Sequence, residues 1–149
     1  MAILAGAEDS LSAGIGFARE NGGNWGTQIR FYTHSTAITT TDELTEQMRL
    51  DASGNLTAAG NITAYSDERL KSDIETLDGS KVYEMRGVSY VKNGQASSGV
   101  IAQELQKVAP ELVNESGEYL SVAYGNLVGY LIEAVKELKA EIDELKGAK

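Results

Sequence analysis

The clearest hydrophobic pattern of the chain lies near its C-terminus. Large apolar residues recur there at alternating steps of three and four, which is the a/d pattern of a coiled-coil helix. They are Val128, Leu131, Val135, Leu138, Ile142 and Leu145. Leu127 and Ile132 flank this seam at positions g and e and widen it. The pattern predicts a helix of about 20 residues, roughly 30 Å long, that closes at Gly147.

The pattern alone does not determine what packs against this apolar seam. β-Branched residues at a with leucine at d favour two-stranded coiled coils, whereas the apolar g and e positions favour a wider interface. Glu141 at g and Lys146 at e can pair across a parallel seam. The alternative is a helix that packs its apolar face on its own domain.

A turn, a short helix and a hairpin precede this region. Asp78-Gly79-Ser80 predicts a turn, and residues 81–85 predict a short helix. Strand-like residues 88–92 run into Asn93-Gly94, a strong short-range hairpin signal, and residues 95–98 form the return strand.

A second helix follows the hairpin. Apolar residues between Val100 and Val108 stand at helical spacing, and Pro110 ends the helix because the residue before a proline avoids the helical region. Gln103 and Glu104 lie within it. This pair could orient a lysine, or simply form a solvated helix face.

Residues 1–65 are rich in Gly, Ala, Thr, Ser and Asn and contain few large apolar residues. Short runs with near-alternating polarity predict strands at 15–18, 28–33 and 47–50. Glycine and asparagine clusters such as residues 21–24 separate them as turns. This part of the chain is therefore predicted to be β-rich.

A six-residue repeat follows, in which residues 53–58 are echoed by residues 59–64. Each unit predicts a Gly-Asn turn and a very short strand with one large apolar residue, Leu56 or Ile62. One such residue cannot offset the backbone entropy of ordering the rest, so the segment needs identical neighbours, as in a trimer about one axis. The alternative is a disordered linker. The residues that argue against disorder are Phe17, Trp25, Phe31, Tyr32 and Met48.

The composition and charge of the chain argue against several kinds of site and partner. The chain has 149 residues, no cysteine and a net charge of −9, so disulfides and thiolate metal sites are excluded. Residues 1–66 carry 3 basic and 7 acidic residues (−4), and the remainder carries 10 and 15 (−5), so both halves repel nucleic acid. The sequence contains no run of roughly eighteen apolar residues, so no membrane insertion is predicted. His34 is expected in a surface loop, and no metal site or cofactor is predicted; three His34 copies at a trimer axis are the alternative.

The candidate chemistry lies in Ser66-Asp67-Glu68-Arg69-Leu70-Lys71, just after a strand-like run at 62–65. A serine nucleophile needs a base, and a lysine is one when burial or a neighbouring cation lowers its pKa. Arg69 is such a cation. On spacing alone, a solvated turn is the favoured interpretation of these six residues.

Three ordered stretches resemble one known family. Ser66 to Ile74 resembles the opening of the intramolecular chaperone domain of phage tail fibres, tailspikes and endosialidases, the self-cleaving peptidase S74 family. Residues 99–105 with 110–113, and then residues 120–138, resemble its later motifs. The resemblance covers the chain from Ser66 to about Leu145, and residues 48–56 resemble the end of a fibre shaft.

The resemblance implies an α+β fold in two parts. Residues 1–66 would be a β-rich trimeric fibre shaft or tip, and residues 67–149 a mainly helical chaperone that ends in a long coiled-coil-like helix. The partners implied are two further copies in a homotrimer and, through the fibre, a host-cell surface receptor. The protein would be made in the host cytoplasm and reside in the virion.

The family also implies a self-cleaving serine endopeptidase that turns over once. Ser66 would be the nucleophile and Lys71 the general base, with the cut at Ser66–Asp67 and with Glu68 and Arg69 tuning the pair. The alternative is a structural or receptor-binding trimeric tip that never cuts. A stand-alone hydrolase is disfavoured, because the sequence has a single histidine and no cysteine.

Overall fold

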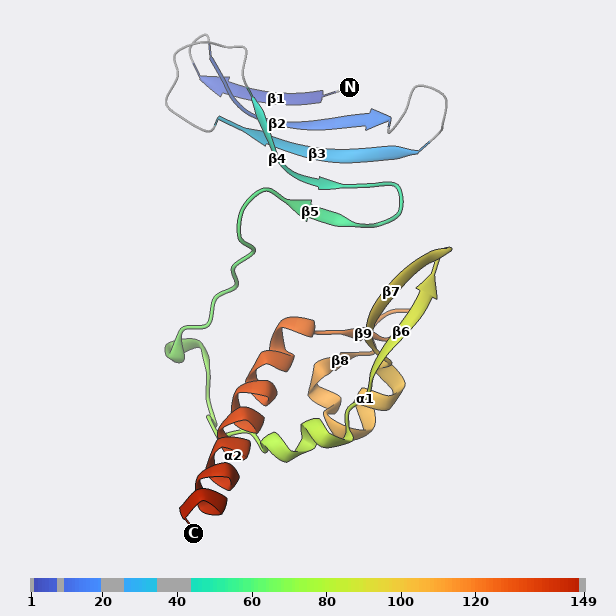
Figure 1. Ribbon diagram of the computed structural model, residues 1–149. Coiled ribbons are helices and arrows are strands. Elements are labelled where there is room, and N and C mark those ends of the chain that lie inside the picture. The colour runs from blue at the N-terminus through green and yellow to red at the C-terminus, as the bar shows by residue number, and fades with distance from the viewer. Residues whose placement is uncertain (1, 8–9, 20–25, 35–43, 148–149) are drawn as a thin grey trace. The chain divides into compact units, whose positions relative to one another are not determined.

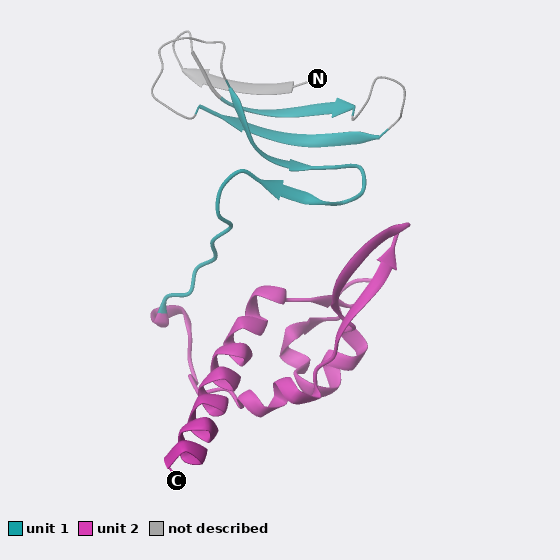
Figure 2. Ribbon diagram, viewed as in Figure 1, with its two compact units in different colours: residues 1–67 teal, residues 68–149 magenta. Residues whose placement is uncertain are grey.

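The computed structural model describes residues 2–7, 10–19, 26–34 and 44–147 (Figure 1). The predicted turn at residues 21–24 and Trp25 lie outside these ranges. The chain divides into two compact units, residues 1–67 and 68–149, one residue beyond the expected boundary (Figure 2). Each unit has its own architecture.

Unit 1 is a five-stranded antiparallel sheet whose strands follow chain order (Figure 1). The strands are β1 (Ala2–Ala7), β2 (Ser10–Arg19), β3 (Thr27–Thr33), β4 (Thr45–Leu50) and β5 (Leu56–Ala58). The predicted strand runs at 15–18, 28–33 and 47–50 are confirmed, because each lies within one of these strands. Bulges interrupt the register at Ala5/Gly6 and Phe31/Tyr32.

The turn between β4 and β5 is organised by one carboxylate. Asp51 Oδ1 accepts hydrogen bonds from the backbone nitrogens of Ser53 and Asn55, both at 2.9 Å. These bonds, together with one from the Asn55 side chain, lower the pKa of Asp51. Gly54 has a φ of 82°, which a residue without Cβ adopts at little cost. The first copy of the six-residue repeat is therefore a turn and strand, as predicted.

The second copy of the repeat does not form a strand. The prediction of a strand at 62–65 is wrong: no regular structure follows β5 until residue 68, and Ile62 and Tyr65 are 77% and 96% exposed. The last ladder hydrogen bond runs from Ala59 N to Gln47 O at 2.8 Å. Beyond it, the segment lacks the neighbouring strand that extended backbone needs.

Unit 2 mixes short helices, a hairpin and one long helix. Its elements are η1 (Glu68–Leu70), η2 (Gly79–Glu84), β6 (Gly87–Lys92), β7 (Gln95–Val100), α1 (Ala102–Val108), η3 (Pro110–Leu112), β8 (Val113–Asn114), β9 (Ser121–Val122), η4 (Tyr124–Asn126) and α2 (Leu127–Gly147). The hairpin turn is confirmed, with φ of 52° at Asn93 and 79° at Gly94, as a two-residue primed turn requires.

Two boundaries in unit 2 differ from the prediction. Asp78-Gly79-Ser80 is the start of η2 rather than a separate turn, because Asp78 caps it by accepting a 3.0 Å hydrogen bond from Ser80 N. Val100 belongs to β7, where it pairs with Gly87, so α1 begins at Ala102 and not at Val100. The long helix is confirmed and ends at Gly147, as expected.

The apolar core of the described chain lies in unit 2. Leu105, Ala109, Leu112 and Tyr130 are each at most 3% exposed and form one cluster. Residues that pack against it come from η2, β7, β8, β9 and α2, and they are Val82, Met85, Val100, Val113, Val122 and Leu127. The core joins α1, η3 and the N-terminal half of α2.

Candidate functional site

The five residues proposed for chemistry lie at the boundary of the two units. Ser66 and Asp67 close unit 1, whereas Glu68, Arg69 and Lys71 open unit 2. All five are exposed. The single turn η1 brings Glu68 and Lys71 together, because Lys71 N donates a 3.0 Å hydrogen bond to Glu68 O. The backbone before Ser66 has no regular structure.

The segment after Lys71 leads to a close contact with α2. A Cβ on Gly129 would lie 3.0 Å from Leu77 Cδ1. Two residues further on, Gly79 N donates a 2.9 Å hydrogen bond to Glu137 Oε1. Gly79 is itself buried against Ala134, which is 4% exposed. These contacts fix the N-terminal end of unit 2 on one side of α2.

A partly buried hydrogen bond ties α2 to η3. The Tyr130 hydroxyl, on a side chain that is 3% exposed, donates to Glu111 Oε1. This bond raises the pKa of Tyr130 to about 12 and lowers the pKa of Glu111. Lys81 Nζ lies 5.9 Å from the Tyr130 ring centroid, within cation–π range. Three separate elements thus meet at Tyr130.

Glu104 pairs with an arginine rather than orienting a lysine. Arg86 Nε donates a 3.1 Å hydrogen bond to Glu104 Oε2, and Arg86 Nη2 donates to Oε1. The hydrogen bonds lower the pKa of Glu104 and raise the pKa of Arg86. This two-pronged pair joins the start of β6 to α1.

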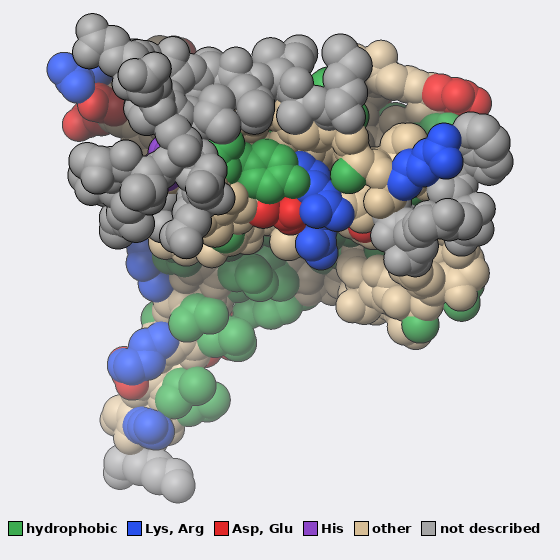
Figure 3. Space-filling model, turned by 90° about the horizontal axis from the view of Figure 1, so that it is seen from above, with side chains coloured by type: hydrophobic (Ala, Val, Ile, Leu, Met, Phe, Trp, Pro, Cys, Tyr) green, Lys and Arg blue, Asp and Glu red, His purple; other side chains and the backbone are tan. Residues whose placement is uncertain are grey.

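The apolar seam of α2 is left uncovered within the chain. Every a and d residue is between 43% and 73% exposed, whereas Tyr130 and Ala134, on another side of the helix, are buried. Figure 3 shows hydrophobic side chains along the protruding length of the helix. Ile132 also stays exposed, at 49%. Leu127, expected to flank the seam, is partly buried against the core of unit 2.

A hollow of about 440 Å³ lies between the hairpin, the start of α1 and β9. Its lining includes Tyr90, Lys92, Gln103, Ser121 and Tyr124. Val100 N donates a 3.4 Å hydrogen bond to the Tyr124 hydroxyl. A Cβ on Gly99 would lie 2.5 Å from that hydroxyl, so a larger residue there would require the Tyr124 side chain to move.

Metal-binding clusters and membrane-spanning helices are both absent from residues 2–7, 10–19, 26–34 and 44–147. Within them, no group of three His, Asp or Glu residues is arranged to hold a metal ion. None of the described helices has the length and apolar character needed to cross a bilayer.

Comparison with known families gives a match that begins two residues before unit 2. Residues 66–114 match the family described as the chaperone of endosialidase, Peptidase S74. The match covers 49 of the 149 residues, about a third of the chain. The matched S74 segment begins at Ser66 and includes η1, the hairpin, α1 and η3. It covers the first two of the three resembling stretches; the third, on α2, lies beyond it.

Phage tail fibre proteins are among the relatives of the chain. The long tail fibre proteins Gp37 of Enterobacteria phages K3 and T2 are both 37% identical to it over 95 residues, or 54% of the chain. The chain spans only 8% and 7% of their lengths. The S74 match and the phage tail fibre relatives agree with the resemblance found in the sequence.

Two further similarities reach beyond the S74 segment. Myelin regulatory factor homolog 1 of Caenorhabditis elegans is 26% identical over 149 residues, which is 89% of this chain and 15% of that protein. The carboxy-terminal domain of the bacteriophage T5 L-shaped tail fiber with its intra-molecular chaperone domain matches 99% of this chain and 54% of its own, with 11% identity and a TM-score of 0.43.

Sequence reasoning missed the contacts that hold the S74 segment on α2. Gly79 and Glu137 are 58 residues apart, and no spacing rule links them. Glu111 lies within the Pro-Glu-Leu-Val stretch that carried the resemblance, but its partner Tyr130 lies between the seam residues of α2. The available signal was Tyr130 itself, the single aromatic residue in α2.

Proposed function

We propose that this chain is the end of a phage tail fibre or tailspike joined to its intramolecular chaperone. Residues 67–149 bring three copies together, assist the folding of residues 1–66 and leave by self-cleavage near Ser66–Asp67. The observation that carries the proposal is an S74 match that begins at Ser66 and continues into unit 2, which exposes an unbroken a/d seam.

The seam supports assembly because unit 2 does not need it for its own core. The core cluster of Leu105, Leu112 and Tyr130 and the residues packed against it include no a or d residue of the seam. The exposed fractions of Leu131 and Leu138, 50% and 43%, are thus available to a neighbour. Fully burying a leucine contributes about 1.5–3 kcal/mol, so six half-exposed seam residues per copy provide a substantial driving force. A parallel three-helix arrangement places Glu141 and Lys146 of adjacent copies within reach of each other.

The role of a chaperone follows from the composition of unit 1. Among its described residues, no large apolar side chain is buried. Contacts between chains are non-local and slow to form. Three α2 helices that associate first reduce the search, because the three sheets are then tethered near one another. Unit 2 would supply that tether from its independently packed fold.

The proposed cleavage uses Ser66 and Lys71. Neutral Lys71 removes the hydroxyl proton, the serine oxygen attacks a carbonyl carbon, and the protonated lysine gives the proton to the departing amide nitrogen. Attack of Ser66 on the Tyr65 carbonyl breaks Tyr65–Ser66 and leaves an ester that water hydrolyses. A cut at Ser66–Asp67 needs the hydroxyl of a neighbouring copy, or a water, to attack the Ser66 carbonyl. Backbone N–H groups would stabilise the oxyanion.

In our proposal, cleavage depends on assembly, because the segment around Lys71 is exposed in the single chain. A lysine acts as a base when its surroundings exclude water or place a cation beside it. Lys71 is exposed in the single chain. Neighbouring copies would provide that exclusion, so cutting would follow trimerisation. Release of the chaperone would then hold the folded fibre kinetically, since the folding catalyst is gone.

A denaturing gel with mass spectrometry of freshly purified protein tests this function. Two fragments are expected, with the C-terminal one beginning at Asp67, or at Ser66 if the ester route operates. A single species of 15.9 kDa that forms stable trimers would support the alternative, a structural or receptor-binding tip that never cuts. The exposed state of all five site residues in the single chain is the observation that keeps this alternative in view.

A further inference from the structure

The sheet of unit 1 has one apolar face. Antiparallel strands place directly opposed residues on the same face. The register pairs Ile15 with Phe31, Phe17 with Ile29, Phe31 with Met48, Ile29 with Leu50 and Leu50 with Leu56. One continuous surface of large apolar side chains therefore runs from β2 to β5. We call it the apolar face.

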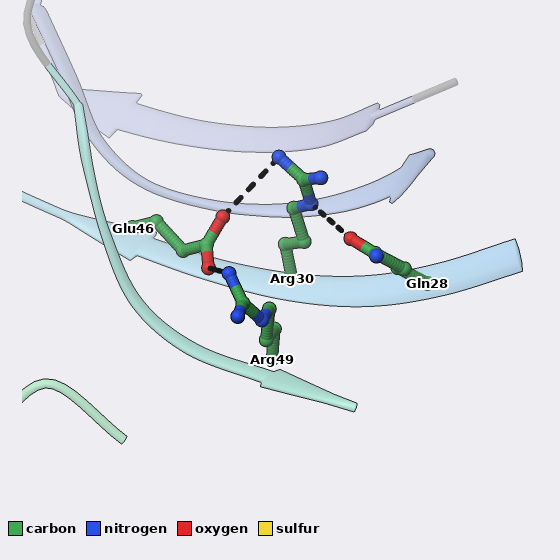
Figure 4. A network of polar contacts seen from close by, with 4 residues as sticks. All are labelled: Gln28, Arg30, Glu46 and Arg49. Carbon is green, nitrogen blue, oxygen red and sulfur yellow. Dashed lines mark hydrogen bonds and ion pairs between the residues drawn. The ribbon is translucent and has the colours of Figure 1, made fainter. Parts of the chain in front are cut away.

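The opposite face is polar and is partly covered by its own side chains. Arg30 lies between Gln28 and Glu46, and Glu46 also pairs with Arg49 (Figure 4). The Tyr32 ring lies over Gly16, where an added Cβ would come within 2.9 Å of Tyr32 Cε2. Hydrogen bonds, ion pairs and an aromatic ring thus satisfy this face within the single chain.

The apolar face has no such cover within unit 1. The unit is a single sheet without a second layer among its described residues. Ile15, Phe17, Leu50 and Leu56 are 36%, 46%, 38% and 55% exposed. A sheet buries one face against another layer to be stable, so this unit is incomplete as a single copy.

We infer that the apolar face packs against the apolar faces of the other copies, so that the three sheets enclose a shared core and their polar faces point to solvent. The distribution of charge favours burial of the apolar face rather than the polar face. Among the described residues of β2–β5, the apolar face carries one charged side chain, Arg19, at the end of β2. The polar face carries Arg30, Glu46 and Arg49, and enclosing these charges between sheets would cost desolvation energy.

Timing and proximity also favour a second copy of the chain. A cover that unit 1 needs for folding must be present while it folds. The exposed seam of α2 belongs to the same chain, so copies associated through it hold their sheets close together. This part of the argument rests on the proposed function, and it extends that function by naming the surface of residues 1–66 that assembly buries.

Adjacent residues on β5 provide a matched test. Leu56 lies on the apolar face opposite Leu50, and Thr57 lies on the polar face opposite Arg49. Both are exposed in the single chain, so a single copy would label equally at either position. The chain has no native cysteine, so Leu56→Cys and Thr57→Cys each introduce one thiol. Maleimide labelling of the full chain should be at least about tenfold slower at Leu56→Cys, and equal at both positions in urea.

Sedimentation of the same two variants separates the inference from the proposed function. A trimer in which both thiols label at the same rate would overturn the inference alone and point to a partner of another kind. A monomer would contradict the inference and the proposed function together. As a second readout, Leu56→Glu should lower the melting temperature of the assembled chain and Thr57→Glu should not, because a carboxylate on the polar face lies opposite Arg49. If both variants had the melting temperature of the wild-type chain, the inference would also be overturned.

Discussion

Gly79 lies directly against the backbone of α2 at Ala134: a Cβ on Gly79 would come within 2.3 Å of the Ala134 nitrogen. No side chain can move aside to relieve this contact, because the neighbouring atoms belong to a helix backbone. Glycine at position 79 is therefore required for η2 to approach α2 closely enough for its N–H to reach Glu137.

The first prediction follows from this contact. Gly79→Ala should destabilise unit 2 by about 1–3 kcal/mol through overpacking, measured by urea unfolding of the full chain. Gly87→Ala is the matched control, since nothing lies within 4 Å of a Cβ at Gly87. Equal stability of the two variants would mean that η2 and α2 are not packed this closely.

The second prediction concerns Tyr130 and Glu111. Tyr130→Phe removes the buried hydroxyl and should cost about 1–2 kcal/mol at neutral pH. Glu111 accepts this bond in its ionised form, so its lowered pKa stabilises the fold above the ordinary carboxyl range, and that stability is lost as the pH falls through the folded pKa. Tyr130 donates only when protonated, so its raised pKa stabilises the fold below pH 10 and this is lost as the pH rises through about 12.

The pH profile of unfolding separates this bond from simple packing. Tyr130→Phe should flatten the loss of stability at both ends of the profile, in acid and above pH 10. A profile parallel to that of the wild-type chain would show that the hydroxyl contributes only volume.

The third prediction concerns the seam of α2. Leu138→Asp should abolish trimers in sedimentation equilibrium, because three unpaired carboxylates would be buried together. In a single chain this residue is 43% exposed, so unit 2 should keep its helical circular dichroism. Ala140→Asp is the control, since Ala140 is exposed and lies outside the seam. Trimers of normal stability in Leu138→Asp would exclude α2 as the element that joins the copies.

The fourth prediction concerns the Ser66–Lys71 pair. Ser66→Ala should abolish cutting, and Lys71→Ala should slow it at least tenfold. Lys71→Arg should not restore it, because arginine stays protonated and cannot act as a base. Cutting should speed up as the pH rises, since the base works in its neutral form. All of these variants should still form trimers.

Ser72→Ala is the matched control for the nucleophile, because it removes a hydroxyl from the same segment. It should cut at the wild-type rate. Fragments with an unchanged new terminus in Ser66→Ala would assign the reaction to another residue or to a contaminating protease.

Local patterns predicted much of the fold because they involve neighbours in sequence. Asn93-Gly94 determines its own turn, and the steps of three and four define α2 without knowledge of any partner. The strand at 62–65 could not be judged in this way, since a strand depends on a neighbour that the sequence does not name. Val100 shows the same limit: its spacing fits a helix, but pairing with Gly87 places it in β7.

The packing of α2 on its own unit was beyond reach for a different reason. The apolar seam dominated the pattern, while the buried side of the helix is marked by Tyr130 and Ala134. Neither is strongly apolar, and their burial depends on Gly79 and Glu111 from distant segments. Both suggested roles of the helix therefore concern different sides of it: one side packs within the unit, and the seam stays exposed.

The shortness of α2 has a consequence for alignment if the seam joins three copies. The helix offers three successive a–d pairs, from Val128/Leu131 to Ile142/Leu145. A slip of one heptad would displace a chain by about 10 Å, the length of roughly three strand residues, and would leave one pair in three unmatched. In such a trimer the fractional penalty for misalignment would be large. The helix would therefore set the three chains in register, and the sheets that precede it would start at the same level along the axis.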